Sequence, residues 1–254
     1  MFVIAAILRS LFIILSVSSL GASLSLNYYE KTCPDAELIV AKAVRNAIMK
    51  DKTVAAALLR MHFHDCFIRS GGPTWEVPKG RKDGIVSRAS ETTQLPAPTF
   101  SISQLQQSFS QRGLSMNDLV ALSGGHTLGF SHCSSFQSRI RNFNATHDID
   151  PSMHPSFAES LKKVCPVKKQ EKNAGATMDP SATTFDNTYF KLILQGKGLF
   201  SSDQALVSIP KTKDLVSKFA SSQGAFSEAF VNSMIKMSSI TGGQEVRKDC
   251  RVVN

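Results

Sequence analysis

The sequence predicts a mainly α-helical fold, and three observations support this prediction. Apolar residues recur at helical spacing, most clearly between Phe226 and Met237. The segment from Ser115 to Asp118 has the spacing of a capping box, which marks the start of a helix. Apolar residues make up 42% of the 254-residue chain, which is enough to form a core. This length allows one large domain or two small ones.

The first 25 residues predict an export signal. Arg9 is the only charge in this stretch, and an apolar run at residues 11–17 is followed by small residues. Cleavage after Ala22 or after Ser25 would fit this pattern. A membrane anchor is the alternative, but Arg9 leaves each apolar stretch too short to span a bilayer comfortably. No second apolar run of spanning length follows, so the mature chain, residues 26–254, is expected to be soluble and secreted.

The predicted helices follow one another along the mature chain. Pro34 is tolerated at the start of the first helix. A stretch at residues 75–98 is broken by prolines and is too irregular for long helices. The helices are expected at residues 35–50, 54–67, 101–112, 119–126, 136–142, 155–164, 185–194, 214–220 and 226–240. In the last helix the apolar stripe indicates core packing rather than a cofactor wall, and it consists of Phe226, Phe230, Met234 and Met237.

One predicted helical face carries a permanent positive charge beside an imidazole. Residues three and four apart are neighbours on a helix, so Arg60, Phe63 and His64 point together. Arginine stays protonated, whereas histidine exchanges a proton near neutral pH. The segment predicts a catalytic pocket with His64 as proton acceptor and Arg60 as charge stabiliser. For this motif alone, an amphipathic helix with a hydrogen-bonded histidine remains the alternative.

A second histidine lies near the glycine-rich end of a predicted helix. The helix that starts near Ser115 runs toward His126, and Gly124, Gly125 and Gly129 surround that histidine in the sequence. Glycines let a bulky group approach the backbone closely. A histidine in such an apolar setting can be an axial ligand of a metal or a haem. Taken alone, this segment favours a hydrogen-bonded structural histidine over a ligand.

Together these two segments resemble the class III secretory haem peroxidases of plants. Further motifs, in the family's order, extend the resemblance over nearly all of the mature chain. They occupy residues 28–34, 71–83, 95–98, 184–190, 198–204 and 247–254. The resemblance implies a single, mainly helical peroxidase domain with haem b between a distal and a proximal helix. It also implies hydrogen peroxide as oxidant and small phenolic or other aromatic donors as substrates.

The resemblance gives each matching residue around the haem a role. His64 resembles the distal histidine, which takes a proton from hydrogen peroxide and returns it to the departing oxygen. Arg60 would stabilise charge as the O–O bond breaks, and Phe63 would restrict access to the iron. His126 resembles the proximal iron ligand. Asp203 resembles the aspartate that accepts the other ring hydrogen of this ligand and makes the imidazole more electron-donating.

Other residues match further binding and covalent features of the family. The proximal calcium site, for which hard oxygen ligands are suited, would comprise Thr127, Asp179, Ser181, Thr184 and Asp186. Pro96 matches a residue at the edge of the channel where aromatic donors dock. Cys133 and Cys165 match a family disulfide. Asn144 begins a glycosylation sequon, which is credible in a secreted chain.

A large internal piece of the family pattern is missing after Arg69. We estimate that roughly 70 residues, enough for several helices, are absent at this point. The missing part holds most ligands of the family's distal calcium, so Asp65 and the Ile68 carbonyl would be remnants of a lost site. It also holds the residues that support the distal histidine. A missing exon, an alternative transcript or an error in gene prediction would each explain an internal gap with intact flanks.

The cysteines record the same gap. The chain has five, and Cys33, Cys66 and Cys250 each lack the cysteine with which they would pair in the family. Each native bridge removed from a secreted protein typically costs about 2–5 kcal/mol, which is comparable with the net stability of a domain. We therefore expect a chain that keeps the family's iron ligand but folds poorly and catalyses weakly.

The net charge of +9 is compatible with anionic partners such as cell-wall polysaccharide. Nucleic-acid binding is not expected, because no basic run is interleaved with aromatic residues. Nothing in the sequence requires an oligomer, so a monomer is expected. The leading interpretation is a secreted, cell-wall or extracellular haem peroxidase. The first alternative is a non-catalytic or unstable truncated form of that family. The second is a copper or zinc protein that uses His62, His64, His126 and His132, although His62 and His64 would point to different sides of a helix.

Overall fold

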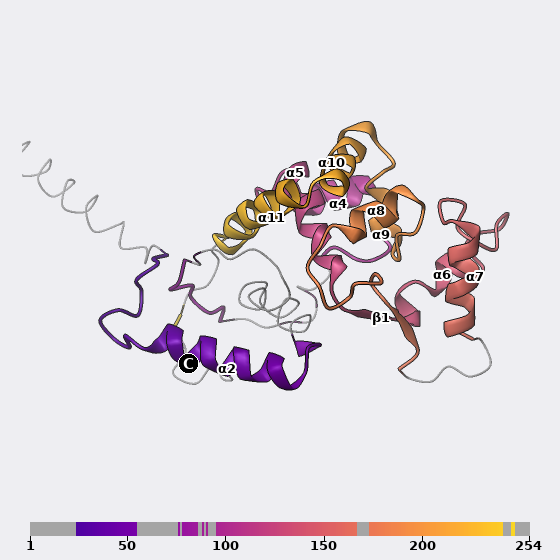
Figure 1. The fold of residues 1–254 in the computed structure, drawn as a ribbon. Helices are drawn as coiled ribbons and strands as arrows, with labels where there is room; N and C mark the ends of the chain where they lie inside the picture. The colour runs from indigo at the N-terminus through magenta and orange to yellow at the C-terminus, as the bar shows by residue number, and fades with distance from the viewer. Residues whose placement is uncertain are drawn as a thin grey trace, which may run out of the picture.

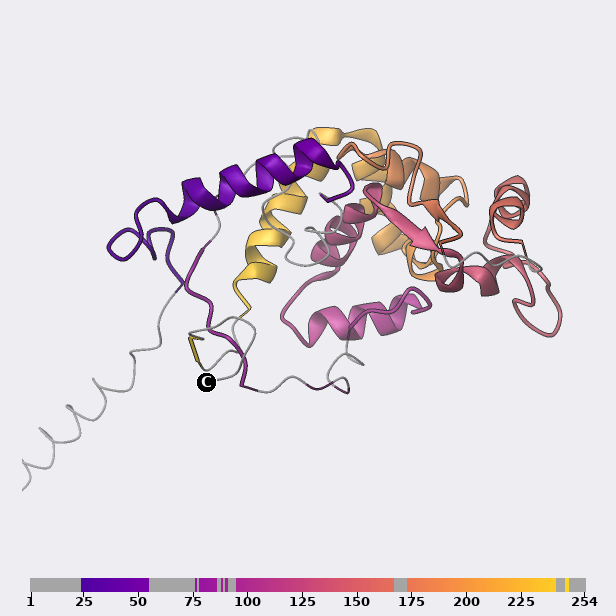
Figure 2. The ribbon, with the colours of Figure 1, turned by 90° about the horizontal axis from the view of Figure 1, so that it is seen from below.

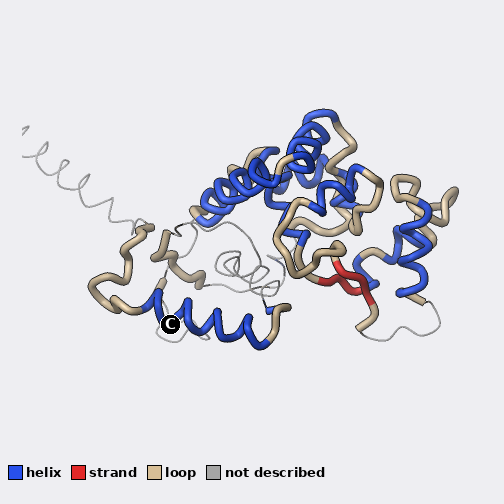
Figure 3. Tube along the Cα trace, in the orientation of Figure 1, coloured by secondary structure: helices blue, strands red, loops and turns tan. Residues whose placement is uncertain are grey.

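The computed structural model describes residues 24–54, 76, 78–85, 88, 90, 95–166, 173–240 and 245–246. This part of the chain is mainly helical, as the sequence predicts (Figures 1 and 3). Its α-helices are α2 (Ala36–Lys50), α4 (Ile102–Ser110), α5 (Met116–Ser123), α6 (Gln137–Ile140), α7 (Pro155–Val164), α8 (Thr188–Leu194), α9 (Ser201–Ala205), α10 (Pro210–Ser221) and α11 (Gln223–Ser238). Two short 3-10 helices, η2 (Gly124–Thr127) and η3 (Cys133–Ser135), and two strands, β1 (Phe130–His132) and β2 (Gly175–Thr177), complete it.

Most of the predicted helices are present, with some ends shifted. α7 has the predicted bounds, and α4 begins after a capping box formed by Ser101. α5 begins after the N-cap Ser115 but ends at Ser123, so His126 lies in the separate η2 rather than in the same helix. α10 is longer than predicted, and the five-residue α9 was missed because it is too short to show a helical period. The helix predicted at 54–67 lies outside the described residues beyond Val54.

The main core lies between α5, α8, α10 and α11, which pack together in the upper part of Figure 1 and remain together in Figure 2. Phe226 is fully buried at its centre. Its ring lies 4.9 Å, centroid to centroid, from the rings of both Phe185 and Phe190. Phe230 and Met234 are also buried, one and two turns further along α11. The apolar stripe of α11 is therefore core, as the sequence predicts.

A buried carboxylate joins the start of α5 to α11. Asp118 accepts hydrogen bonds at Oδ2 from the backbone N–H of Ser115 (2.6 Å) and from Lys236 Nζ (2.6 Å). Ser233 donates its hydroxyl to Oδ1 over 2.9 Å. Burial opposes ionisation of Asp118, but the hydrogen bonds from Lys236, Ser115 and Ser233 outweigh it and lower the pKa of this carboxyl to about 2. This cluster of Asp118, Ser115, Ser233 and Lys236 is called the α5–α11 clamp below.

A two-stranded antiparallel sheet follows the histidine segment and was not predicted. β1 pairs with β2 in the register Phe130↔Thr177, Ser131↔Ala176 and His132↔Gly175 (Figure 3). A Cβ atom at Gly175 would lie 2.0 Å from the Ser131 carbonyl oxygen, so this position requires glycine. Strands of three residues are too short to give an alternating sequence signal, which explains why the pattern of residues did not indicate them.

Buried Arg139 positions the chain just before α9. Its Nε donates to Asp150 Oδ2 over 2.8 Å, and only 1% of the side chain is exposed. Its Nη1 donates to three successive carbonyl oxygens, those of Gly198, Leu199 (3.1 Å) and Phe200 (3.0 Å). One side chain thus fixes the backbone that leads directly to Asp203.

The first described helix is largely uncovered. Among the residues of α2, only Ile48 is buried, whereas Leu38 is 69% and Ile39 is 60% exposed. In Figure 1, α2 lies to one side of the group formed by α5, α8, α10 and α11. Within the described part of the chain, none of the helices combines the length and the apolar character needed to cross a bilayer.

Candidate functional site

His126 stands where the end of α5 meets the phenylalanine core. A Cβ atom at Gly124 would lie 2.4 Å from the ring of Phe226 and 2.8 Å from that of Phe190. Glycine therefore allows this backbone to pack directly on the core, as the glycine-rich sequence predicts. After η2, Gly129 adopts a φ of +104°, a conformation that favours glycine, and leads the chain into β1.

The structure brings His126 and Asp203 together across 77 residues of sequence. The distance between His126 Nδ1 and Asp203 Oδ1 is 2.8 Å. The aspartate side chain is 1% exposed, whereas the imidazole is 42% exposed. Because a carboxylate only accepts hydrogen bonds, Nδ1 is the donor to Asp203, and in the neutral imidazole the lone pair is then on Nε2. Nε2 faces away from the carboxylate and is the atom of this pair that can bind a metal.

Two aromatic residues complete the surroundings of this pair. Tyr189, on α8, donates its hydroxyl to Asp203 Oδ1 over 2.9 Å, and the Phe200 N–H donates to Oδ2 over 2.8 Å. Both rings also meet the His126 ring edge to face, at centroid distances of 5.9 Å for Tyr189 and 5.3 Å for Phe200. Burial, together with the charge of Asp203, raises the pKa of Tyr189 well above its ordinary value, so its hydroxyl stays protonated.

Sequence reasoning missed Tyr189, Phe200 and Arg139 at this site. Tyr189 belongs to one of the motifs that carry the family resemblance, yet nothing in the motif indicates that its hydroxyl reaches Asp203. Phe200 stands three residues before Asp203, at the start of a helix too short to predict. A buried arginine has no sequence signal of its own, because arginine is mostly a surface residue.

Next to His126, a second group of residues collects oxygen atoms. Thr127 Oγ1 lies 2.7 Å from Asp179 Oδ2 and 3.3 Å from Asp186 Oδ1. Ser181 donates both its N–H (2.8 Å) and its hydroxyl (3.0 Å) to Asp179 Oδ1. Thr184 is exposed, and its N–H donates to the Ser181 carbonyl over 2.6 Å. The five residues predicted for a proximal calcium site are thus gathered in one region.

The chemistry of this group fits a hard cation. Burial, with a contribution from the nearby charge of Asp186, raises the pKa of Asp179. A divalent cation would stabilise the ionised form of the buried Asp179 carboxylate and offset its repulsion by Asp186. Within the described residues, no three His, Cys, Asp or Glu side chains gather in a way that could hold a metal ion. A calcium site here would therefore depend on hydroxyl and backbone oxygens as well as on the two carboxylates.

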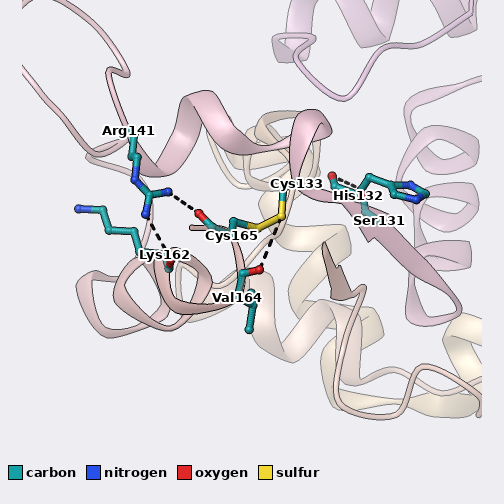
Figure 4. Close-up of a disulfide and its surroundings, with 7 residues drawn as sticks. All are labelled: Ser131, His132, Cys133, Arg141, Lys162, Val164 and Cys165. Carbon is teal, nitrogen blue, oxygen red and sulfur yellow. Dashed lines mark hydrogen bonds between the residues drawn. A yellow bond between two sulfur atoms is a disulfide. The ribbon is translucent and has the colours of Figure 1, made fainter. Parts of the chain in front are cut away.

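The predicted disulfide between Cys133 and Cys165 is present, with a Cα–Cα distance of 5.8 Å. Figure 4 shows the bridge beside Arg141, which donates to the carbonyl oxygens of Cys165 (2.9 Å) and Lys162 (3.2 Å). Cys33 is exposed and free. Cys66 and Cys250 lie outside the described residues.

Pro96 and Asn144 are both exposed. Pro96 lies in a loop whose Pro98 carbonyl accepts the N–H of Ser202 over 2.9 Å, so this loop is attached to α9 next to Asp203. The Asn144 side-chain oxygen accepts hydrogen bonds from the N–H and hydroxyl of Thr146, both over 2.9 Å. The sequon therefore lies on a turn at the surface.

The predicted distal residues lie outside the described part of the chain. They are Arg60, Phe63, His64, Asp65 and Ile68, and His62 of the copper or zinc alternative also lies outside the described residues. His132, named in the copper or zinc alternative, is exposed on β1, and its ring meets that of Phe130 at a centroid distance of 5.6 Å. It forms no metal-binding cluster with the other described residues.

Comparison with known proteins identifies the family of this chain. The sequence profile described as Peroxidase matches residues 68–222, more than half of the chain. The chain is 49% identical to Peroxidase 64 of Arabidopsis thaliana over 314 residues, which cover 98% of this chain and 99% of the relative. The chain belongs to the peroxidase family. It is also 44% identical to Peroxidase 66 of the same plant, over 92% of this chain and 93% of the relative.

The alignments agree with an internally shortened peroxidase. The alignments with Peroxidase 64 and Peroxidase 66 extend over 314 and 301 residues, whereas this peroxidase has 254. The relatives thus contain residues that this chain lacks. The family profile begins to match at residue 68, next to the junction predicted from the sequence.

Proposed function

We propose that this peroxidase is a secreted haem enzyme that oxidises small aromatic donors, phenols in particular, with hydrogen peroxide. The observation that carries the proposal is the His126–Asp203 pair, in which a buried carboxylate accepts the hydrogen bond from Nδ1–H and leaves Nε2 free to bind iron. Family membership supports the same reaction, since the relatives named above are peroxidases.

The proximal residues would hold the cofactor. Haem b, when bound, supplies the redox chemistry that removes electrons from the donor. His126 would bind the iron through Nε2, and Asp203 would fix the ring orientation and raise its basicity. Thr127, Asp179 and Asp186, assisted by Ser181 and Thr184, would bind Ca²⁺. Because Thr127 is adjacent to His126, calcium would stabilise the backbone that carries the iron ligand.

The distal roles follow from the family resemblance. His64 would take a proton from hydrogen peroxide and return it to the departing oxygen, and Arg60 would stabilise the developing negative charge. Phe63 would limit access to the site, and Pro96 would stand where an aromatic donor docks. Distal calcium, with Asp65 and Ile68 as remnant ligands, would be lost.

Secretion is part of the proposal. Residues 1–25 would be removed as a signal peptide, leaving residues 26–254. The Cys133–Cys165 bridge supports an oxidising compartment, and the exposed Asn144 would carry a glycan there. The net charge of +9 would favour anionic polysaccharide of the cell wall.

The shortened chain is expected to turn over more slowly than its relatives. It has lost the partners of its distal residues and of three cysteines, one of which, Cys33, is free and exposed. A distal histidine without its supporting hydrogen bonds is less well oriented for proton transfer. Weak turnover with retained haem binding is therefore the expected behaviour.

The test is to express the secreted chain, reconstitute it with haem and record its Soret band and its peroxide-dependent oxidation of a phenol. The Soret band should be present in the wild type and lost in His126→Ala. His147→Ala removes an exposed histidine whose side chain is hydrogen-bonded to the adjacent Thr146. It is the matched control and should keep the band.

Two results would contradict the proposal. Absence of a Soret band in the wild type, or an unchanged band in His126→Ala, would refute His126 as the iron ligand. A wild type that binds haem but gives no peroxide-dependent product would refute catalysis and favour the non-catalytic alternative.

A further inference from the structure

Asp203 Oδ1 accepts two hydrogen bonds at once. One comes from His126 Nδ1 at 2.8 Å and the other from the Tyr189 hydroxyl at 2.9 Å. The second carboxylate oxygen is occupied by the Phe200 N–H at 2.8 Å. The charge of this buried carboxylate is therefore divided among three protein donors, and two of them share one oxygen.

Sharing an oxygen has a chemical consequence for the imidazole. The tyrosine hydroxyl withdraws electron density from Oδ1, so this oxygen accepts the His126 Nδ1 proton less strongly. A weaker acceptor leaves more of the proton on Nδ1 and makes Nε2 a poorer electron donor. Because both partners are buried, no solvent stands in for the hydroxyl when it is removed.

We propose that Tyr189 is a positioning residue that limits the electron donation of His126 by hydrogen-bonding Asp203. Its effect is opposite in sign to that of Asp203, which increases the donation. The inference rests on the proposed role of His126 as the iron ligand. Tyr189, on α8, would thus set how strongly His126 donates electrons, in addition to packing in the core.

The location of Tyr189 suits this role. Its ring is edge-on to His126 and also contacts Phe190 at a centroid distance of 5.1 Å, so core packing fixes the hydroxyl in place. Of the three tyrosines in the chain, the other two, Tyr28 and Tyr29, are exposed. A Tyr→Phe change at either of them removes the same hydroxyl from an exposed side chain and serves as a control.

The test compares haem-reconstituted wild type, Tyr189→Phe and the control Tyr29→Phe. In Tyr189→Phe we expect the Soret band to remain, the iron–histidine stretching band of the reduced protein to move to higher frequency, and the reduction potential to fall. Tyr29→Phe should match the wild type in all three. In haem-free protein, the Nδ1 proton resonance of His126 should move downfield in Tyr189→Phe alone.

A double-mutant cycle distinguishes electronic tuning from packing. In an Asp203→Asn background, Tyr189→Phe should no longer change the stretching band, because the carboxylate through which it acts is gone. An unchanged band and potential in Tyr189→Phe with the Soret band intact would overturn this inference while leaving the proposed function standing. Loss of the Soret band in Tyr189→Phe alone would also overturn it, since the hydroxyl would then serve haem retention. Absence of the band in the wild type would refute the proposed function itself, and this inference with it.

Discussion

Asp203 is almost inaccessible to solvent, and its charge is stabilised by three hydrogen-bond donors. A buried carboxylate without such partners would be strongly destabilising. Here the donors come from η2, α8 and the residue before α9, so the same bonds that satisfy the charge also hold these segments together. The hydrogen bonds to Asp203 that orient His126 therefore also stabilise the fold.

The oxygen-rich group beside His126 leads to the residue-scale prediction. Asp186→Asn should reduce the stabilisation of the folded chain by Ca²⁺, because it removes one of two carboxylates around Thr127. A cation present at a hundredfold its dissociation constant stabilises a protein by about 2.7 kcal/mol. The expected loss of melting temperature on chelation is several degrees in the wild type and clearly smaller in the variant.

Thermal unfolding with and without a calcium chelator measures this effect. Asp214→Asn removes an exposed aspartate of α10 and serves as the control, which should respond to the chelator like the wild type. If chelation leaves the melting temperature of the wild type unchanged, the residues gathered around Thr127 do not form a calcium site.

At the scale of elements, the α5–α11 clamp fixes the helix that ends just before His126. Asp118 both completes the capping box of α5 and binds two side chains of α11. An ion pair such as that between Lys236 and Asp118 contributes little when both side chains are exposed. Here the Asp118 side chain is only 8% exposed, whereas that of Lys236 is 47% exposed. Helix capping and helix–helix packing therefore depend on one ionised group.

The clamp makes stability depend on pH in a defined direction. The folded-state pKa of Asp118, about 2, is below the ordinary value of 3.8, so its contribution is fully present above about pH 4 and is lost as the pH falls toward 2. The shift corresponds to at most about 2 kcal/mol, reduced by screening at the exposed lysine. Asp118→Asn should lower the free energy of unfolding at neutral pH by about 1–2 kcal/mol and flatten its decline between pH 4 and pH 2.

Urea unfolding at a series of pH values checks this prediction, with Asp214→Asn as the control of equal charge change. An Asp118→Asn variant whose free energy of unfolding declines between pH 4 and pH 2 as steeply as that of the wild type would show that the clamp does not carry the effect.

At the scale of the whole molecule, the buried apolar residues are distributed unevenly among the described helices. The core between α5, α8, α10 and α11 contains most of the fully buried phenylalanines of the described residues, whereas α2 buries only Ile48. A helix of this length has little stability of its own in water and depends on packing. In the relatives the chain is longer, and this one keeps α2 without that additional length.

Hydrogen exchange should reveal this difference. Amide protons of α2 are expected to exchange at least about tenfold faster than those of α11, a difference of about 1.4 kcal/mol in opening free energy. Exchange followed by mass spectrometry of peptides from α2, α7 and α11 measures it. α7 serves as an internal reference, because its Ala158 and Leu161 are buried in a separate apolar cluster with Cys133 and Cys165. Equal protection of α2 and α11 would contradict the view that α2 is less stabilised by packing than α11.

Much of this fold is readable from local sequence. The capping spacing at Ser115 and the stripe of α11 predicted helices correctly, because these signals act within a few residues. The three-residue strands and the five-residue α9 were missed, since segments of this length carry no measurable period. The family motifs supplied the pairing of Cys133 with Cys165, which spacing alone does not define.

The sequence by itself determined the helical class, the peroxidase family, the internal gap and the identity of His126 and Asp203 as matching residues. Only the tertiary structure decided that Tyr189 and His126 share one oxygen of Asp203 and that Arg139 holds the backbone before it. The physical reason is the range of the interactions. Capping and periodicity join neighbours along the chain, whereas these hydrogen bonds join buried groups far apart in sequence, and their partners exist only once the core has formed.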